Sequence, residues 1–166
     1  QLAMLRYQLN PHFLFNTINA ISSLVIDHHN EEAETMLGRL SDFLRFALQT
    51  SPDERVTLDE ELAAQDLYLE IEKARFDSRL EVVREVEPGI GKALLPSLIL
   101  QPVLENSVKY AVSRSRVQVR IEIHVRREGD MLVLDVTDSG GPIPATPPGG
   151  TGVGLNNIRA RLDVLY

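Results

Sequence analysis

The chain has 166 residues, of which 43% are hydrophobic and 25% charged, a composition typical of one ordinary globular domain or two small ones and not of a disordered chain. It contains no cysteine, which excludes disulfide frameworks and cysteine-based zinc sites. The net charge of −7, with Lys and Arg dispersed, argues against a nucleic-acid partner, because a protein that binds the phosphate backbone normally has a basic face.

The chain begins with Gln1 instead of Met, in the middle of an amphipathic pattern. No apolar run reaches the roughly 18 residues that a membrane-spanning helix needs, and no signal peptide is visible. We therefore expect a piece of a longer protein.

The first third of the chain predicts a helical hairpin. Apolar residues recur at helical spacing over residues 2–25 and again over 33–47, with a short polar break between. Pro11 lies inside the first pattern and should bend that helix just ahead of His12. Two long helices with a short connection run antiparallel, and a second copy would cover their apolar stripe in a four-helix bundle. We assign this hairpin to residues 1–53.

Residues 54–166 predict helices and strands in an α+β arrangement. A capping-box pattern from Thr57 to Glu60 begins a helix, and strict alternation over 117–125 is the best strand signal in the chain. The other expected elements, in chain order, are a strand at 80–86, a helix with Pro96 in its first turn that continues through Asn106, a strand at 131–136, a Gly/Pro-rich loop at 139–152 and a helix at 154–166.

The segment from Gln8 to Asn16 reads QLNPHFLFN and is the first candidate site. His12 and Asn16 are four residues apart, which on a helix places their side chains on one face, one turn apart. An imidazole beside a carboxamide suits chemistry on the imidazole better than it suits core packing.

A second candidate segment, LQPVLENSVKY, runs from Leu100 to Tyr110. Asn106 and Lys109 are three residues apart, and hence on one face of the predicted helix. A neutral oxygen ligand suits Mg²⁺ that keeps its waters and binds mainly through phosphates, while a lysine neutralises phosphate charge. The alternative is an exposed polar stripe on the surface of the helix.

Two glycine-containing loops follow. Asp138 and Gly140 lie at a strand exit, and residues 149–157 (GGTGVGLNN) lead into a helix. Glycines there let backbone N–H groups approach an anion, and the helix N-terminus adds partial positive charge. For each loop the alternative is an ordinary surface loop or turn.

In this order, the four segments resemble the motifs of the LytS-like sensor histidine kinases: the phosphoacceptor box around His12, the N box from Leu100 to Tyr110, and two glycine boxes. The resemblance covers nearly the whole chain. It implies a dimerising hairpin at 1–53 that is followed at 54–166 by an α/β sandwich ATP-binding domain of the Bergerat, or GHKL, type.

The resemblance also implies roles for individual residues. His12 would accept the γ-phosphoryl group of ATP and pass it to an aspartate of a response regulator receiver domain. Asn106 would ligate Mg²⁺, with Glu105 as a second candidate, Asp138 would bind the adenine amino group, and Gly140 would permit close approach to the base. The residues expected at ATP are Asn106, Lys109, Tyr110, Asp138, Gly140, Gly150, Thr151, Gly152, Gly154 and Leu155.

The chain departs from the family pattern at several points. Many histidine kinases have an acidic residue directly after the histidine, whereas this chain has Phe13, so we expect catalysis to depend on orientation of the ring by Gln8 or Asn16. Asn16 would also position a water that dephosphorylates the regulator. Pro142 stands where the family has a further glycine, and the two strands that normally complete the sheet are absent, so the ATP domain is predicted to be truncated at its C-terminus.

Three functions fit these patterns. The first is an ATP-dependent histidine kinase core, dimeric, and part of a membrane-anchored sensor whose kinase portion is cytoplasmic. The second is a signalling scaffold or regulator phosphatase with weak catalysis, which the Pro142 loop and the missing strands favour. The third is a related ATPase without phosphohistidine, against which the hairpin with His12 argues.

Overall fold

The computed structural model describes residues 10–51, 54–141 and 158–163. The elements are α2 (Pro11–Ile26), α3 (Asn30–Gln49), β1 (Arg55–Thr57), α4 (Leu58–Phe76), a 3-10 turn (Asp77–Arg79), β2 (Leu80–Val86), β3 (Leu94–Pro96), α5 (Gln101–Ser107), a π-helical turn (Val108–Val112), β4 (Val119–Glu128) and β5 (Met131–Asp138), with a helical stretch at 158–163. The mixed α+β fold predicted from the sequence is confirmed.

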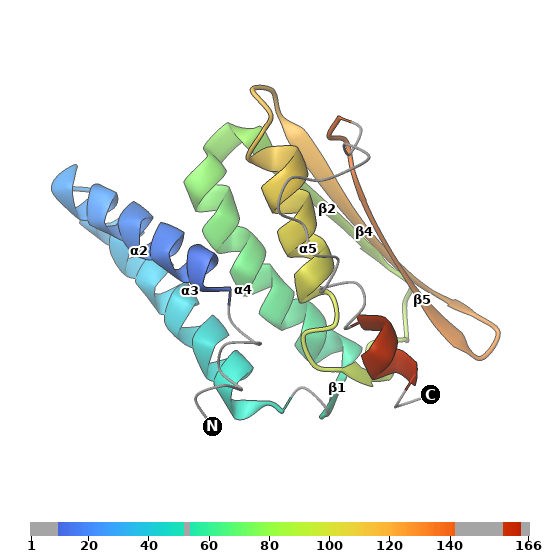
Figure 1. Cartoon of the computed structure of the whole chain (residues 1–166). Helices are drawn as coiled ribbons and strands as arrows, with labels where there is room; N and C mark the ends of the chain where they lie inside the picture. The colour runs from blue at the N-terminus through green and yellow to red at the C-terminus, as the bar shows by residue number, and fades with distance from the viewer. Residues whose placement is uncertain (1–9, 52–53, 142–157, 164–166) are drawn as a thin grey trace.

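Helices α2 and α3 form the predicted antiparallel hairpin, which projects from the rest of the molecule (Figure 1). The expectation of a bend at Pro11 is wrong for the described residues, because Pro11 is the first residue of α2 and Asn10 is its N-cap. Proline is favoured at this position, since the N–H groups of the first helical turn have no partner within the helix.

The main sheet has the order β2-β4-β5, with β2 parallel to β4 and β5 antiparallel to β4. Alternation along β4 buries Val119, Ile121, Ile123 and Val125 against the helices. The residues between them face the other way and form ion pairs with neighbouring strands, as Arg120 does with Glu81 at 3.0 Å. Helices α4 and α5 cover one face of this sheet, and the hairpin packs on α4, away from the sheet (Figure 1).

The prediction that Pro96 begins a helix is wrong. Pro96 ends β3, which pairs antiparallel with β1, so that Arg55 lies opposite Pro96 and Thr57 opposite Leu94. Helix α5 begins five residues later, and Pro102 occupies its first turn.

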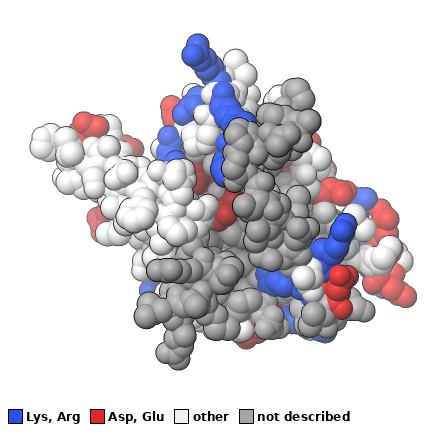
Figure 2. Space-filling model, in the orientation of Figure 1, with Lys and Arg blue, Asp and Glu red and all other residues white. Residues whose placement is uncertain are grey.

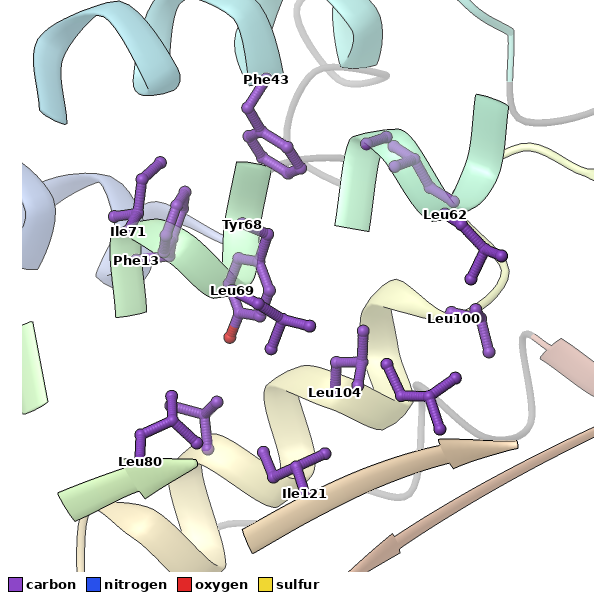
Figure 3. Close-up of a cluster of buried hydrophobic side chains, with 14 of the residues drawn as sticks. Phe13, Phe43, Leu62, Tyr68, Leu69, Ile71, Leu80, Leu100, Leu104 and Ile121 are labelled. Carbon is purple, nitrogen blue, oxygen red and sulfur yellow. The ribbon is translucent and has the colours of Figure 1, made fainter. Parts of the chain in front are cut away.

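One hydrophobic core extends from the hairpin to the sheet. Figure 3 shows Phe13 and Phe43 from the hairpin, Tyr68 from α4, Leu104 from α5 and Ile121 from β4 in this continuous cluster. Each of these side chains is at most 3% exposed. The proposed boundary at residue 53 therefore separates two segments that pack against each other through α4.

Candidate functional site

His12 lies in the first turn of α2, where its side chain is exposed. The Asn16 side-chain nitrogen is 3.0 Å from Nδ1 and 3.3 Å from Nε2 of His12, which confirms that the two side chains meet across one helical turn. Gln8, the other residue expected to orient the ring, lies outside the described residues. The ring is thus exposed to solvent, and among the described residues the side chain that hydrogen-bonds it is the Asn16 carboxamide.

The residues on either side of His12 attach α2 to the rest of the molecule. The Asn10 side-chain oxygen accepts the His12 backbone N–H at 3.0 Å, and its amide nitrogen donates to Glu105 Oε2 at 3.3 Å. Phe13 is 3% exposed, with its ring centroid 5.6 Å from that of Phe43 and 5.0 Å from that of Tyr68. The start of α2 therefore contacts both α4 and α5.

The predicted N box forms α5 and the π-helical turn that follows. Asn106 is half-buried and Lys109 is exposed, and the Lys109 ammonium lies 4.9 Å from the centre of the Tyr110 ring. The Arg114 guanidinium lies 5.1 Å from the same ring, so two cations flank Tyr110. Such contacts favour positive charge beside an aromatic face, and they concentrate cations where phosphate is expected.

Glu105 is half-buried, and both of its carboxylate oxygens accept hydrogen bonds from within the chain. Its Oε1 accepts the Gln101 amide at 3.0 Å while Oε2 accepts that of Asn10. Burial raises the pKa of Glu105, although these hydrogen bonds and nearby Lys109 oppose the rise. Because both carboxylate oxygens already accept hydrogen bonds, Asn106 is the better candidate for Mg²⁺.

The first glycine loop lies against Ala111, the residue directly after the N box. Asp138 Oδ1 accepts the Gly140 N–H at 3.1 Å, which folds the loop back on itself. A Cβ at Gly140 would lie 2.4 Å from Cβ of Ala111 and 3.0 Å from its Cα, too close for any side chain. Gly140 therefore lets this loop pack on the N-box helix, a role that the sequence did not predict; its approach to a base stays a prediction.

The second glycine box lies outside the described residues. This holds for Pro142 and for five of the residues expected at ATP, which are Gly150, Thr151, Gly152, Gly154 and Leu155. Within the described ranges, the structure brings Asp138 and Gly140 to the same end of the N box as Lys109 and Tyr110. No three His, Asp or Glu side chains of those ranges converge as a metal cluster.

Glu61 is the residue that sequence analysis missed. It is fully buried in α4, and its carboxylate accepts the backbone N–H of Leu98 at 2.7 Å, the N–H of Leu100 at 3.0 Å and the Gln65 amide at 3.2 Å. Leu100 is the N-cap of α5, so Glu61 stabilises the loop from which the N box begins. Leu98 has a φ of 54°, an unfavourable conformation for leucine that this contact holds in place.

Arg161, in the helical stretch at 158–163, reaches the same loop. Its guanidinium donates to the Ser97 carbonyl at 2.5 Å. Burial raises the pKa of Glu61, and the positive charge of Arg161 is among the interactions that oppose this rise. The segment after the second glycine box is thereby connected to the start of the N box.

Two family models match the chain in succession. The one described as "Histidine kinase" matches residues 1–80, and "Histidine kinase-, DNA gyrase B-, and HSP90-like ATPase" matches residues 91–165. Phe13 and Tyr68 lie in the first region, whereas the N box and Asp138 lie in the second.

Curated relatives align along nearly the whole chain. The sensor histidine kinase BtsS of Escherichia coli K12 is 40% identical over 162 residues, which cover 97% of this chain and 28% of BtsS. The sensor protein LytS of Staphylococcus epidermidis RP62A is 35% identical over 178 residues, covering 100% of this chain and 30% of LytS. LytS of Enterococcus faecalis is 32% identical over 177 residues with the same coverage of both proteins.

The chain therefore spans less than a third of the length of these relatives. Four observations agree on one family: the order of the motifs, the hairpin with an exposed His12, the packing of Gly140 on Ala111 directly after the N box, and the matches to both family models. The chain belongs to the LytS-like sensor histidine kinases and contains their histidine kinase segment and their ATP-binding segment.

Proposed function

We propose that this chain is the catalytic core of a two-component sensor, which uses ATP to phosphorylate His12 and then transfers the phosphoryl group to an aspartate of a response regulator. The observation that supports this most directly is the exposed His12 ring, held by Asn16, in a chain that also has an ATP-binding segment.

The proposed transfer needs a free lone pair on one imidazole nitrogen. That nitrogen attacks the γ-phosphorus, the bond from this phosphorus to the β–γ bridging oxygen breaks, and ADP leaves with the electron pair. In the structure the Asn16 amide nitrogen lies 3.0 Å from Nδ1, where it can only donate to a ring lone pair. For transfer, the carboxamide must turn so that its oxygen accepts the Nδ1 proton, and the lone pair then lies on Nε2. Because no acidic side chain follows His12, orientation replaces proton removal as the contribution of the protein.

The nucleotide would lie along the N box. Asn106 would hold Mg²⁺ together with phosphate oxygens, and Lys109 would offset phosphate charge, with Asp138 at the adenine. When bound, Mg²⁺ supplies neutralisation of the charge that develops on the transferring group. The clustering of Lys109, Tyr110 and Gly140 at one end of the N box supports this placement.

Incubation with labelled ATP and Mg²⁺ tests the proposal. The wild-type chain should acquire an acid-labile label that His12→Gln loses entirely, while nucleotide binding persists in that variant. His29→Gln serves as the matched control, since His29 is exposed at the far end of the hairpin and should not affect labelling. Nucleotide binding without any label on the wild-type chain would contradict the kinase assignment.

A second experiment tests the role of Asn16. Asn16→Ala should lower the autophosphorylation rate roughly tenfold to hundredfold, as expected when a reacting group loses its orientation. It should also slow dephosphorylation of the regulator if Asn16 positions the water. Unchanged rates in both assays would remove Asn16 from the mechanism.

Dimerisation through the hairpin is part of the proposal. The hairpin projects with a largely uncharged visible surface (Figure 2), and Phe15 and Ile26 are 68% and 75% exposed. Within the described part of the hairpin, the large apolar side chains of Ile18, Val25, Leu37 and Leu48 are exposed as well. A second copy packing on this face would complete a four-helix bundle, so sedimentation equilibrium should give twice the mass of one chain.

Among the described residues, no helix is both long and apolar enough to cross a membrane. We propose that the chain is the cytoplasmic kinase portion of a longer, membrane-anchored sensor. The length of the curated relatives, of which it covers 28–30%, supports this placement.

A further inference from the structure

We propose that Asn10 and Glu105 form an intramolecular clamp that positions His12 at the nucleotide site of its own chain. This inference rests on the proposed function and deepens it, because it names two positioning residues and makes autophosphorylation an event within one chain.

Both polar atoms of the Asn10 carboxamide form hydrogen bonds. The oxygen accepts the His12 backbone N–H at 3.0 Å, and the nitrogen donates to Glu105 Oε2 at 3.3 Å. Glu105 is fixed in turn, because its second oxygen accepts the Gln101 amide at 3.0 Å. The first turn of α2 is therefore held against α5 by a chain of three side chains.

A cap alone does not explain the choice of asparagine. Serine, threonine and aspartate cap helices about as well, because a cap requires only an acceptor oxygen. A hydrogen bond to the Glu105 carboxylate additionally requires a side-chain donor that is long enough to reach it. Aspartate has no such donor, and the serine hydroxyl is too short. Asn10 combines the two functions in one side chain.

Phe13 provides a second attachment on the other side of His12. Its buried ring lies 5.0 Å from the Tyr68 ring of α4 and 5.6 Å from the Phe43 ring of α3. With Asn10 held on α5 and Phe13 held on α4, helix α2 cannot rotate about its axis without breaking one of the two contacts. His12 lies between them, and its ring stays exposed.

The clamp places His12 near its own N box. Glu105 directly precedes Asn106, and His12 is two positions after Asn10, a stretch that spans at most about 7 Å. All of these residues belong to one chain. A triphosphate held at Asn106 and Lys109 would thus have the histidine of the same protomer as its nearest acceptor.

Kinetics of Asn10→Ser separate the clamp from the cap. Serine retains the cap but cannot reach Glu105, so kcat for autophosphorylation should fall about tenfold to hundredfold while KM for ATP stays within about twofold. Asn10→Asp caps well but places a second carboxylate beside Glu105, so its kcat should fall at least as far as that of Asn10→Ser. Asn19→Ser, on the exposed face of the same helix, is the matched control and should leave both constants unchanged. An unchanged kcat in Asn10→Ser, or a rise in KM in place of the loss in kcat, would overturn the proposal.

A double substitution tests whether the two residues act through each other. If they do, the double variant Asn10→Ser with Glu105→Ala should have the same activity as the less active of the two single variants. Losses that multiply would show that the residues act independently and would refute the clamp.

Crosslinking tests the contact without relying on activity. The chain has no native cysteine, so Asn10→Cys with Glu105→Cys provides one thiol pair for a short bismaleimide. We expect a crosslink within one chain, which runs as a monomer on a denaturing gel, and none in either single-cysteine variant. A covalent dimer, or no crosslink, would refute the clamp, whereas an intrachain crosslink in a protein that takes no label from ATP would refute only the kinase assignment.

Discussion

Helix α4 buries two carboxylates that meet very different surroundings. Glu61, near the start of the helix, accepts backbone N–H groups from Leu98 and Leu100. Glu72, eleven residues later, contacts the Arg75 guanidinium at 2.8 Å and 2.6 Å and lies close enough to Glu105 to feel its charge. Both are at most 2% exposed.

The two sites stabilise their carboxylates in different ways. Burial raises the pKa of both groups; at Glu61 the backbone donors oppose the rise, whereas at Glu72 the pKa reaches about 7 although Arg75 opposes it. The short contacts with Arg75 suggest an ion pair, but the removal of water outweighs it. At one end of α4, Glu61 thus anchors the start of the N box. At the other end, Glu72 titrates near neutral pH, close to Glu105 of the clamp.

Replacing the anchor should have the largest effect. Glu61→Ala leaves the N–H groups of Leu98 and Leu100 buried without an acceptor, and we expect it to lower the free energy of unfolding by about 3 to 5 kcal/mol. Denaturant unfolding at pH 7 measures this. Glu70→Ala, on a more exposed position of the same helix, is the control and should cost under about 1 kcal/mol. If Glu61→Ala and Glu70→Ala lowered the free energy of unfolding equally, Glu61 would not be an anchor of the N box.

Glu72 should make the free energy of unfolding depend on pH. Its folded pKa of about 7 lies above the ordinary value of 4.5, so the advantage of the neutral form is complete below pH 4.5 and is lost as pH rises to 7. At about 1.4 kcal/mol per pKa unit, the stability of the wild type relative to Glu72→Gln should fall by up to about 3 kcal/mol across that range and then stay level. Denaturant unfolding of both proteins from pH 4.5 to 8 checks the slope, and a flat or rising difference would mean that the ion pair with Arg75 prevails.

The smallest effect is expected at the cap of α4. Thr57 Oγ accepts the Glu60 N–H at 3.3 Å, while Glu60 Oε2 accepts the Thr57 N–H at 2.8 Å. Thr57→Ala should cost about 1 kcal/mol in unfolding free energy, and Thr57→Ser much less. A loss as large as that of Glu61→Ala would show that the exposed cap, and not the buried carboxylate, holds this end of the helix.

Features with a local signature could be predicted from the sequence. The capping box at Thr57, the alternation of β4 and the proximity of His12 to Asn16 each follow from spacing along one element. Pro96 was misplaced because its strand pairs with β1, about forty residues earlier, and no local pattern records that pairing.

The polar stripe on α4 shows a second limit. Glu61, Gln65, Tyr68 and Glu72 share one helical face, which in a sequence looks like a solvated surface. In the structure all four are buried. The backbone N–H groups of Leu98 and Leu100 and the side chain of Arg75 supply polar partners to that face. These partners come from elsewhere in the fold, so the sequence pattern alone does not reveal them.

The π-helical turn at Val108–Val112 makes the site sensitive to a change in chain length. In this turn the Val108 carbonyl accepts the N–H of Ser113, five residues on, in place of the usual four. Deleting one residue there would let the helix revert to regular α geometry at little cost in backbone hydrogen bonds. The deletion would nevertheless turn every later side chain by about 100° relative to Asn106, including Arg114. Insertions and deletions in the N box should therefore be more damaging to nucleotide binding than most substitutions within it.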